Sequence, residues 1–341
     1  MRLRELSLAG WLVPALLLGA VLLRPAELDP VADPAPVGLR DFRADESRTI
    51  PAYLDADDPR RTVRVFSVRF YAHAGERRFV ATQVVARQPS GTPDSLLMAA
   101  VSLTCSPTMG GVVNAGATQN LMRGSAATFT PRFVYVVPRT GMVACVVTAT
   151  GLRPRPSDSG YRSANVWLVD SGSYLSVSDP VGSWPRSIET TARSRVLDHG
   201  EQWTPIRRTV SVGDVSSFRV VSDHKLTTCS AVGGSRDTTT AGRELCDNRV
   251  STIGSTLRLV VRAVQLTSRG RPCAEAQVVA QRLARVRAPV HHQMVFAVGE
   301  VLVSRAPGCV PDFNLFGTLT QVWGADVVVH ATSELTSVLP R

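Results

Sequence analysis

Residues 255–264 read STLRLVVRAV and decide the fold class. The stretch is rich in β-branched and aliphatic residues, which favours a strand. Successive side chains of a strand point to opposite faces, so Arg258 and Arg262 would share one face while Leu257 and Leu259 share the other. The stretch therefore predicts a half-buried β-strand with a basic outer face.

Similar runs rich in Val, Phe and Thr recur throughout the chain beyond residue 60, separated by turn-forming residues. They predict strands over 62–71, 78–86, 96–105, 131–137, 141–150, 208–212, 216–221, 255–264, 293–303, 314–322 and 325–331. Residues 274–286 are ambiguous. Their Ala, Gln, Arg and Leu content permits a helix, whereas residues 277–280 repeat the QVVA of the strand-like residues 83–86. Strands at this spacing are typical of an all-β sandwich protein.

The 341 residues exceed what one hydrophobic core usually organises, so two folded units are expected. With 44% hydrophobic and 19% charged residues, the chain excludes a wholly disordered protein, a collagen, a coiled coil and a multispan membrane protein. The net charge is +10, but Lys225 is the single lysine among 38 basic residues. This suggests a coding bias toward Arg, so basicity alone is weak evidence of a ligand.

The N-terminus carries the clearest targeting signal. Arg2 and Arg4 precede residues 6–23, which lack charged side chains, and Arg24 follows. As a helix the apolar run would be about 27 Å long, just enough to cross a bilayer. We interpret residues 1–24 as a signal-anchor or a signal peptide. The absence of paired small residues before a cleavage point favours an anchor inserted through residues 6–23, with the rest of the chain outside the cytoplasmic membrane.

Composition then divides the chain. Residues 25–60 are Pro-rich and acidic, with four Arg against nine Asp or Glu, and predict an extended linker. Residues 61–341 hold 31 Lys or Arg against 18 Asp or Glu. A Pro- and Ser-rich segment at 151–160 suggests a first sandwich over 61–154, a second over 155–334 and a C-terminal tail over 335–341.

Six cysteines in an exported chain predict disulfides, because the compartment outside the membrane is oxidising. Of the fifteen possible pairings we expect the sequential one, which keeps each bridge inside one predicted unit. The expected bridges are Cys105–Cys145, Cys229–Cys246 and Cys273–Cys309. No CxxC or HxxxH spacing occurs, so no metal site is expected.

The spacing of Cys105 and Cys145, with residues 141–144 reading GMVA, resembles the inter-sheet bridge of immunoglobulin-like domains. Two features depart from that family: Val143 stands where its Tyr would be, and no Trp lies between the cysteines. The resemblance therefore supports a sandwich and not membership of that superfamily. Together with the N-terminal and linker segments, it leads us to expect two disulfide-stabilised β-sandwich (immunoglobulin-like) domains behind an N-terminal apolar helix and an acidic tether.

No motif for catalysis or for a cofactor is complete. GxSxG, GxxxxGK, HExxH and GxGxxG are all absent. Residues 170–173, DSGS, resemble the nucleophile segment of chymotrypsin-like proteases, with His73 upstream, but Val169 and Ser173 break the pattern. We therefore assign no catalytic residue and expect no cofactor. Three of the five tryptophans, Trp167, Trp184 and Trp203, fall in a region of uncertain structure, and tryptophans most often anchor packing.

The remaining positive signal is a cluster of arginines between residues 258 and 287, where Glu275 is the single acid. Its members are Arg258, Arg262, Arg269, Arg271, Arg282, Arg285 and Arg287. Such a patch could hold an anionic wall polymer or lipid headgroups through charge-assisted hydrogen bonds. The alternative is a solvated sheet face in an Arg-biased protein. Nucleic acid is not expected as a partner, because the cluster contains no interleaved aromatics.

These features predict an exported, membrane-tethered cell-envelope protein that acts as a non-catalytic binding or structural module. Its expected partner is an anionic cell-envelope polymer or another envelope protein. The alternative is an extracytoplasmic hydrolase whose site is assembled from residues distant in sequence.

Overall fold

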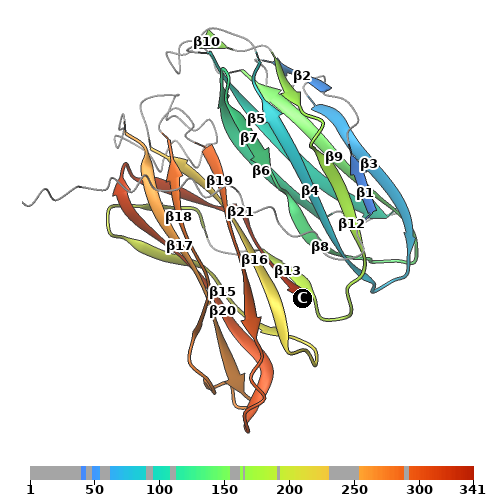
Figure 1. The fold of residues 1–341 in the computed structure, drawn as a ribbon, viewed down its shortest axis with the longest axis vertical. Coiled ribbons are helices and arrows are strands. Elements are labelled where there is room, and N and C mark those ends of the chain that lie inside the picture. The colour runs from blue at the N-terminus through green and yellow to red at the C-terminus, as the bar shows by residue number, and fades with distance from the viewer. Residues whose placement is uncertain are drawn as a thin grey trace, which may run out of the picture. The chain divides into compact units, whose positions relative to one another are not determined.

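A computed structural model describes residues 40–43, 48–53, 62–89, 95–107, 113–153, 162–163, 166–189, 193–229, 253–287 and 292–341. These residues form β-strands and no helix, as the sequence patterning predicts (Figure 1). The predicted N-terminal segment, residues 1–24, and most of the predicted linker lie outside them. Residues 40–43 and 48–53 were predicted as part of that linker, but they form strands of the fold. The linker prediction is wrong there, because Ile50 and Ala52 are buried in the first core. In the part of the chain that is described, no helix is long and apolar enough to cross a membrane.

The first half of the described chain forms two layers of strands around one core. One layer is centred on β4, with β12, β8, β7 and β11 beside it, and the other is centred on β9 and β5, with β3 and β6 beside them. The strand β2 pairs with β11 and β9 and so joins the layers. The bounds are β1 Arg40–Arg43, β2 Arg48–Tyr53, β3 Thr62–Ala72, β4 Arg77–Arg87, β5 Ser95–Pro107, β6 Val113–Met122, β7 Ala126–Phe129, β8 Arg132–Val136, β9 Gly141–Leu152, β10 Arg162–Ser163, β11 Val166–Val169 and β12 Tyr174–Pro180.

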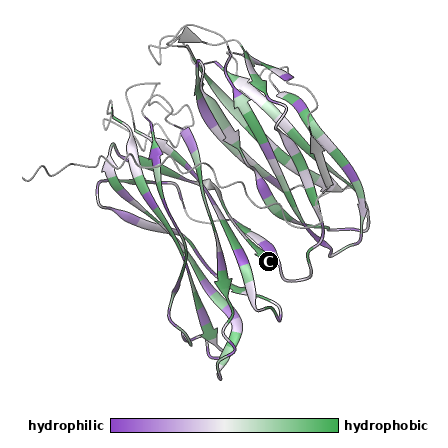
Figure 2. Cartoon of the chain, viewed as in Figure 1, coloured by the Kyte–Doolittle hydropathy of each residue, from purple (hydrophilic) through white to green (hydrophobic). Residues whose placement is uncertain are grey.

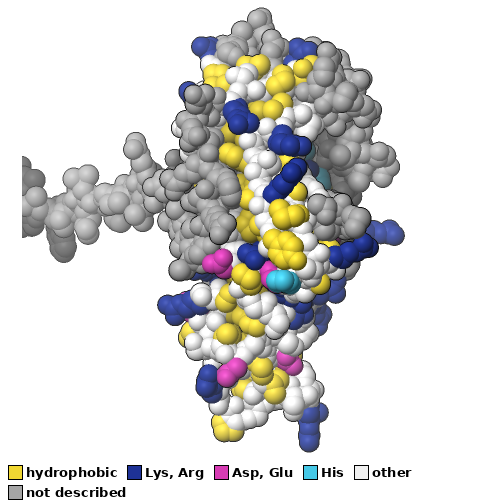
Figure 3. Space-filling model, turned by 90° about the vertical axis from the view of Figure 1, so that its right-hand side faces the viewer, with side chains coloured by type: hydrophobic (Ala, Val, Ile, Leu, Met, Phe, Trp, Pro, Cys, Tyr) yellow, Lys and Arg dark blue, Asp and Glu magenta, His cyan; other side chains and the backbone are white. Residues whose placement is uncertain are grey.

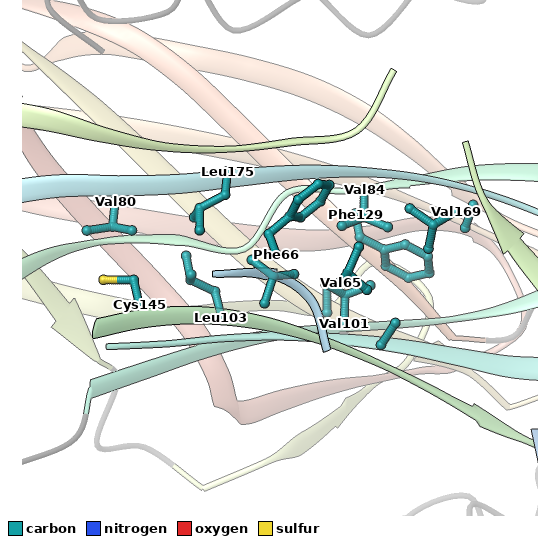
Figure 4. Close-up of a cluster of buried hydrophobic side chains, with 14 of the residues drawn as sticks. Val65, Phe66, Val80, Val84, Val101, Leu103, Phe129, Cys145, Val169 and Leu175 are labelled. Carbon is teal, nitrogen blue, oxygen red and sulfur yellow. The ribbon is translucent and has the colours of Figure 1, made fainter. Parts of the chain in front are cut away.

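Alternating apolar residues of the two layers meet in this first core. Leu175 from β12 and Leu103 from β5 point toward each other across it (Figure 4), and both are fully buried. Trp167 is also fully buried and packs at 6.3 Å, between ring centroids, against Phe129. The packing role expected for this tryptophan is therefore observed.

Cys105 and Cys145 form the first predicted disulfide, but it is not an inter-sheet bridge. The two residues lie directly opposite each other on the neighbouring strands β5 and β9, with their Cα atoms 4.0 Å apart. The expectation of an immunoglobulin-like bridge between sheets is wrong, because the cysteines occupy one cross-strand pair of a single layer.

The second half packs a five-stranded sheet against a four-stranded sheet. The five-stranded sheet has the order β13-β21-β16-β19, with β14 also paired to β21, and the four-stranded sheet has the order β15-β20-β17-β18. The bounds are β13 Arg186–Glu189, β14 Arg195–Leu197, β15 Gln202–Ser211, β16 Ser217–Thr228, β17 Ser255–Thr267, β18 Gln277–Val286, β19 His292–Leu302, β20 Cys309–Gly324 and β21 Val327–Pro340. Residues 277–286 thus form a strand, which resolves the ambiguity between helix and strand.

Apolar side chains from both sheets form the second core. Phe218 of β16 and Phe313 of β20 meet edge to face, with ring centroids 4.9 Å apart. Trp184 and Trp203 pack against this core. Figure 2 shows the alternation of hydrophobic and hydrophilic residues along the strands that produces such cores.

The predicted bridge Cys273–Cys309 is also present, and it links the β17–β18 connection to the start of β20. Cys229 is also held in a disulfide. Its predicted partner, Cys246, lies outside the described residues.

Strand pairing divides the chain at other points than the sequence suggested. The strand β10 pairs with β5, β11 pairs with β2 and β4, and β12 pairs with β4. Residues 162–180 therefore belong to the first half and not to the second sandwich. Residues 335–340, predicted as a tail, are the end of β21 and pair with β13 and β16. The Pro and Ser content of residues 151–160 predicted a loop. Composition alone does not distinguish a loop inside one sandwich from a linker between two sandwiches.

The two halves contact each other inside one compact unit, Pro36–Arg341. A small apolar cluster joins Phe79 and Val134 of the first half to Val221 and Leu339 of the second. Beside it, the buried guanidinium of Arg132 donates two hydrogen bonds to the Asp223 carboxylate, at 3.2 and 2.9 Å. The first half of the chain therefore covers part of the outer surface of the five-stranded sheet, at β16 and β21.

Candidate anion-binding face

The four-stranded sheet turns one surface to the second core and the other to solvent. Along β17, Leu257, Leu259 and Val261 are buried, whereas Arg258 and Arg262 are exposed. We call the solvent side of this sheet the outward face. It comprises Gln202, Thr204, Arg207 and Thr209 of β15, Thr256, Arg258, Val260 and Arg262 of β17, Val278, Gln281, Leu283 and Arg285 of β18, and Asn314, Phe316, Thr318, Thr320 and Trp323 of β20.

Three of the predicted arginines lie on the outward face. Arg258 and Arg262 project from β17, and Arg285 of β18 lies opposite Thr256 of β17. All three side chains are exposed. Within the described part of the chain, none of the three makes an ion pair with an acidic side chain. Their charges are thus available to an external anion.

A fourth arginine joins them from a distant part of the sequence. Phe316 of β20 lies opposite both Arg262 of β17 and Arg207 of β15. The Arg207 guanidinium lies 5.8 Å from the centroid of the Phe316 ring, which is a cation–π distance. The sequence cluster of residues 258–287 did not include Arg207, because its place on the sheet depends on the pairing of β15 with β20.

Large apolar side chains on the outward face are exposed beside these arginines. The exposed fractions are 58% for Trp323, 57% for Leu283 and 58% for Val278. Leu283 lies opposite Arg258 and Val278 opposite Arg262. A surface that alternates guanidinium groups with apolar and aromatic groups can bind the charged substituents of a polymer and pack on its apolar faces at once.

Hydroxyl and amide groups fill the positions between them. The Thr204 and Thr318 hydroxyls are 3.0 Å apart, and the Thr209 hydroxyl donates to Asn314 Oδ1 at 2.6 Å. These bonds orient the polar side chains of β15 and β20 on the sheet surface.

The other predicted arginines lie elsewhere. Arg269 and Arg271 are exposed in the β17–β18 connection, where the Arg271 backbone is bonded to Thr267. Arg287 follows the last residue of β18. These three border the sheet and are not on the outward face.

Arg282 was predicted as part of the cluster, but it is on the inner side of β18, opposite Leu259. Its guanidinium lies 4.7 Å from the Phe296 ring centroid and donates to the Phe296 carbonyl at 3.0 Å. Burial lowers the pKa of Arg282. The side chain thus closes the gap between β18 and β19, so including it in an exposed patch was wrong.

The residues that resemble a protease site are separate surface features. His73 is exposed and meets the Tyr71 ring edge to face, with centroids 5.4 Å apart. Ser171 lies in the exposed turn between β11 and β12. Among the described residues, no interaction joins His73 to Ser171.

Basic side chains are not confined to the outward face. Figure 3 shows another side of the molecule, where Lys and Arg are interspersed with hydrophobic side chains. What distinguishes the outward face is the ordered row formed by Arg207, Phe316 and Arg262 across three strands.

No family model and no curated protein matches the chain. Among solved structures it is similar to the N-terminal CBM22-1–CBM22-2 tandem domain of Paenibacillus barcinonensis Xyn10C, with 8% identity over 89% of this chain and 93% of that one and a TM-score of 0.24. It is also similar to truncated AlyQ with CBM32 and alginate lyase domains, with 10% identity, coverages of 89% and 99% and a TM-score of 0.18. A structure of infectious bursal disease virus, Gx strain, gives 10% identity, coverages of 89% and 81% and a TM-score of 0.16. At these TM-scores the likeness carries no inference about function.

Proposed function

We propose that the chain is a non-catalytic binding module of the cell envelope, which holds an anionic polymer on the outward face of its four-stranded sheet. The observation that carries this proposal is the set of exposed arginines, Arg207, Arg258, Arg262 and Arg285, without acidic partners among the described residues. Arg258 and Arg262 are four residues apart on one strand, so their Cα atoms are separated by roughly 13 Å. This spacing suits a ligand whose charges repeat along its length.

The disulfides support a location outside the cytoplasm, because such bonds form and persist in oxidising compartments. In this proposal residues 6–23 anchor the chain in the membrane and residues 25–39 separate the folded part from it. Protease treatment of intact cells tests this location. Degradation of residues 61–341 is expected, whereas their protection in intact cells together with degradation after lysis would contradict it.

The binding test uses the full chain in a neutral detergent with polygalacturonate as a carboxylate polymer, polyphosphate as a phosphate polymer and dextran as a neutral one. The variant R207Q/R258Q/R262Q is expected to bind the better anionic polymer at least tenfold more weakly than the wild type. Binding is also expected to weaken as salt rises from 50 to 500 mM, because ions screen exposed charges.

A matched control separates the outward face from net charge. Arg69, Arg123 and Arg139 are exposed and off the four-stranded sheet. The variant R69Q/R123Q/R139Q loses the same charge and should bind within twofold of the wild type. Equal losses in both variants, or tight binding of dextran, would show that the outward face is not the binding surface.

A further inference from the structure

A cavity of about 410 Å³ lies where β6 of the first half approaches the five-stranded sheet of the second. Its walls include Asn114 and Gly116 of β6, Glu189 of β13, Asp223 of β16, Met294 of β19 and Leu335 of β21. This size is typical of small-ligand pockets, which run from roughly 300 to 1,000 Å³. None of these residues belongs to the outward face.

The β6 wall of the cavity is a free strand edge. Among the described strands, β6 pairs with β5 alone. In an antiparallel pair, residues alternate between hydrogen-bonded and non-hydrogen-bonded positions, and the latter have closer Cα atoms. The 4.0 Å between the Cα atoms of Cys105 and Cys145 marks a non-hydrogen-bonded pair on the β9 side of β5, so the backbone groups of Cys105 point to β6.

The register carries this alternation into β6. Cys105 lies opposite Val113, and the pairing continues without a bulge to Ser102 opposite Gly116. Val113 and Ala115 therefore direct their N–H and C=O groups to β5, whereas Asn114 and Gly116 direct theirs away from it, to the free edge. Both residues line the cavity, so it contains two sets of backbone donors and acceptors arranged as in an unpaired sheet edge.

The opposite walls are acidic. Arg132 and Asp223 neutralise each other through their two hydrogen bonds. Glu189 is exposed and has no ion pair within the described residues. The charged groups of the lining thus sum to −1, which favours a cationic ligand and disfavours an anionic one.

The volume limits the length of a strand-like ligand. A strand residue occupies a cell of about 3.3 Å along the strand, 4.8 Å between strands and 10 Å between sheets, or roughly 160 Å³. The cavity therefore accommodates about two to three residues of extended chain.

We propose that this cavity binds a short extended peptide segment with a basic side chain, which adds as a strand to β6 at Asn114 and Gly116 and places its positive charge near Glu189. Backbone pairing supplies the affinity, and the carboxylate selects the sequence. This site is distinct from the outward face and does not depend on the proposed polymer binding.

The test measures binding of three-residue peptides to the full chain in neutral detergent by fluorescence anisotropy, with a neutral fluorophore on each peptide. Acetyl-Val-Lys-Val-amide is expected to bind at least tenfold more tightly than acetyl-Val-Glu-Val-amide. Two N-methylated forms of the Lys peptide, one methylated at Lys and one at both Val residues, report the backbone pairing. Alternate residues of a strand direct their N–H groups to the same neighbouring strand. One methylated form should therefore bind at least tenfold more weakly than the unmethylated Lys peptide, and the other should bind within threefold of it.

Variants of the protein locate the site. G116P removes the backbone N–H at the free edge, which proline can do without breaking the ladder to β5. G116P should weaken binding of the Lys peptide at least tenfold. The matched G116A variant should bind that peptide as tightly as the wild type, because an added Cβ meets only the Val101 carbonyl oxygen at 3.7 Å. E189Q should reduce the preference for the Lys over the Glu peptide to less than threefold.

Several outcomes would overturn the proposal: equal binding of the Lys and Glu peptides, equal affinity of the two N-methylated forms, or unchanged binding by G116P. Saturable binding of glucosamine in the absence of peptide binding would assign the cavity to a saccharide instead. The N-methylated peptides test the wild-type protein and so remain decisive if G116P fails to fold.

Discussion

The two sheets of the second half differ in how many of their surfaces meet solvent. In the four-stranded sheet, β17 alternates between buried apolar residues and exposed or half-buried ones. In the five-stranded sheet, β16 is buried at almost every position, because the second core covers one surface and the first half of the chain covers the other. One sheet therefore has a solvent-exposed surface, and the other contacts the first half of the chain.

The covered sheet contains polar residues that must find partners inside the protein. The Thr227 hydroxyl lies 2.7 Å from both His292 Nδ1 and His330 Nε2. The Ser222 hydroxyl lies 2.8 Å from His224 Nε2. Buried polar groups are costly unless they are hydrogen-bonded, and these hydroxyl and imidazole groups lie within hydrogen-bond distance of one another. Polar groups on the outward face of the four-stranded sheet are free of this constraint, because water can bond them.

The largest expected effect comes from breaking the buried ion pair of the five-stranded sheet. D223A leaves the Arg132 guanidinium buried without its carboxylate and should lower the free energy of unfolding by about 3 to 5 kcal/mol. Denaturation in urea measures this change. D214A is the control, because the Asp214–Arg305 pair is exposed and should contribute little. Equal effects of the two variants would show that the contact between the halves does not bury a charge.

Removal of the Cys273–Cys309 bridge tests the four-stranded sheet. The bridge closes a separation of 36 residues, and the chain-entropy model gives about 4 kcal/mol for a loop of that length. C273A/C309A should lose roughly that stability in urea denaturation. Both cysteines are partly exposed, whereas Cys105 and Cys145 are fully buried. Mild reductant should therefore expose Cys273 and Cys309 to alkylation first, and mass spectrometry that found Cys105 modified earlier would contradict the burial.

Adjacent residues of β17 test the two surfaces of the exposed sheet. Leu259 is fully buried in the second core, so L259A should lower the free energy of unfolding by about 3 kcal/mol. R258A removes an exposed side chain from the neighbouring position and should leave stability nearly unchanged. If the two variants had similar effects on the urea midpoint, the assignment of inner and outward faces would be reversed or wrong.

The smallest effect concerns the close approach of the two sheets at β19. A Cβ at Gly299 would overlap the Val279 carbonyl of β18, so G299A should cost about 1 to 3 kcal/mol. G116A serves as its control, because a Cβ there would make only an ordinary van der Waals contact, with the Val101 carbonyl oxygen at 3.7 Å. Thermal unfolding of both variants distinguishes them, and a neutral G299A would indicate that β18 and β19 are further apart.

Much of the strand content follows from local sequence. The alternation in residues 255–264 predicted a strand, and β17 spans Ser255–Thr267 with Arg258 and Arg262 on the solvent side. The assignment failed at Arg282 for a specific reason. Because residues 274–286 were ambiguous between helix and strand, the period-two rule that separates Arg282 from Arg285 could not be applied.

By itself, the sequence determined the all-β class, the positions of many of the longer strands and the Cys105–Cys145 and Cys273–Cys309 pairings, since these depend on residue alternation and on nearby cysteines. Only the tertiary structure decided that Arg207 joins Arg262 around Phe316, that residues 335–340 complete β21, and that β6 leaves a free edge beside Glu189. Such features depend on which strands become neighbours. That choice is set by cross-strand packing between residues far apart in the chain, and local periodicity does not encode it.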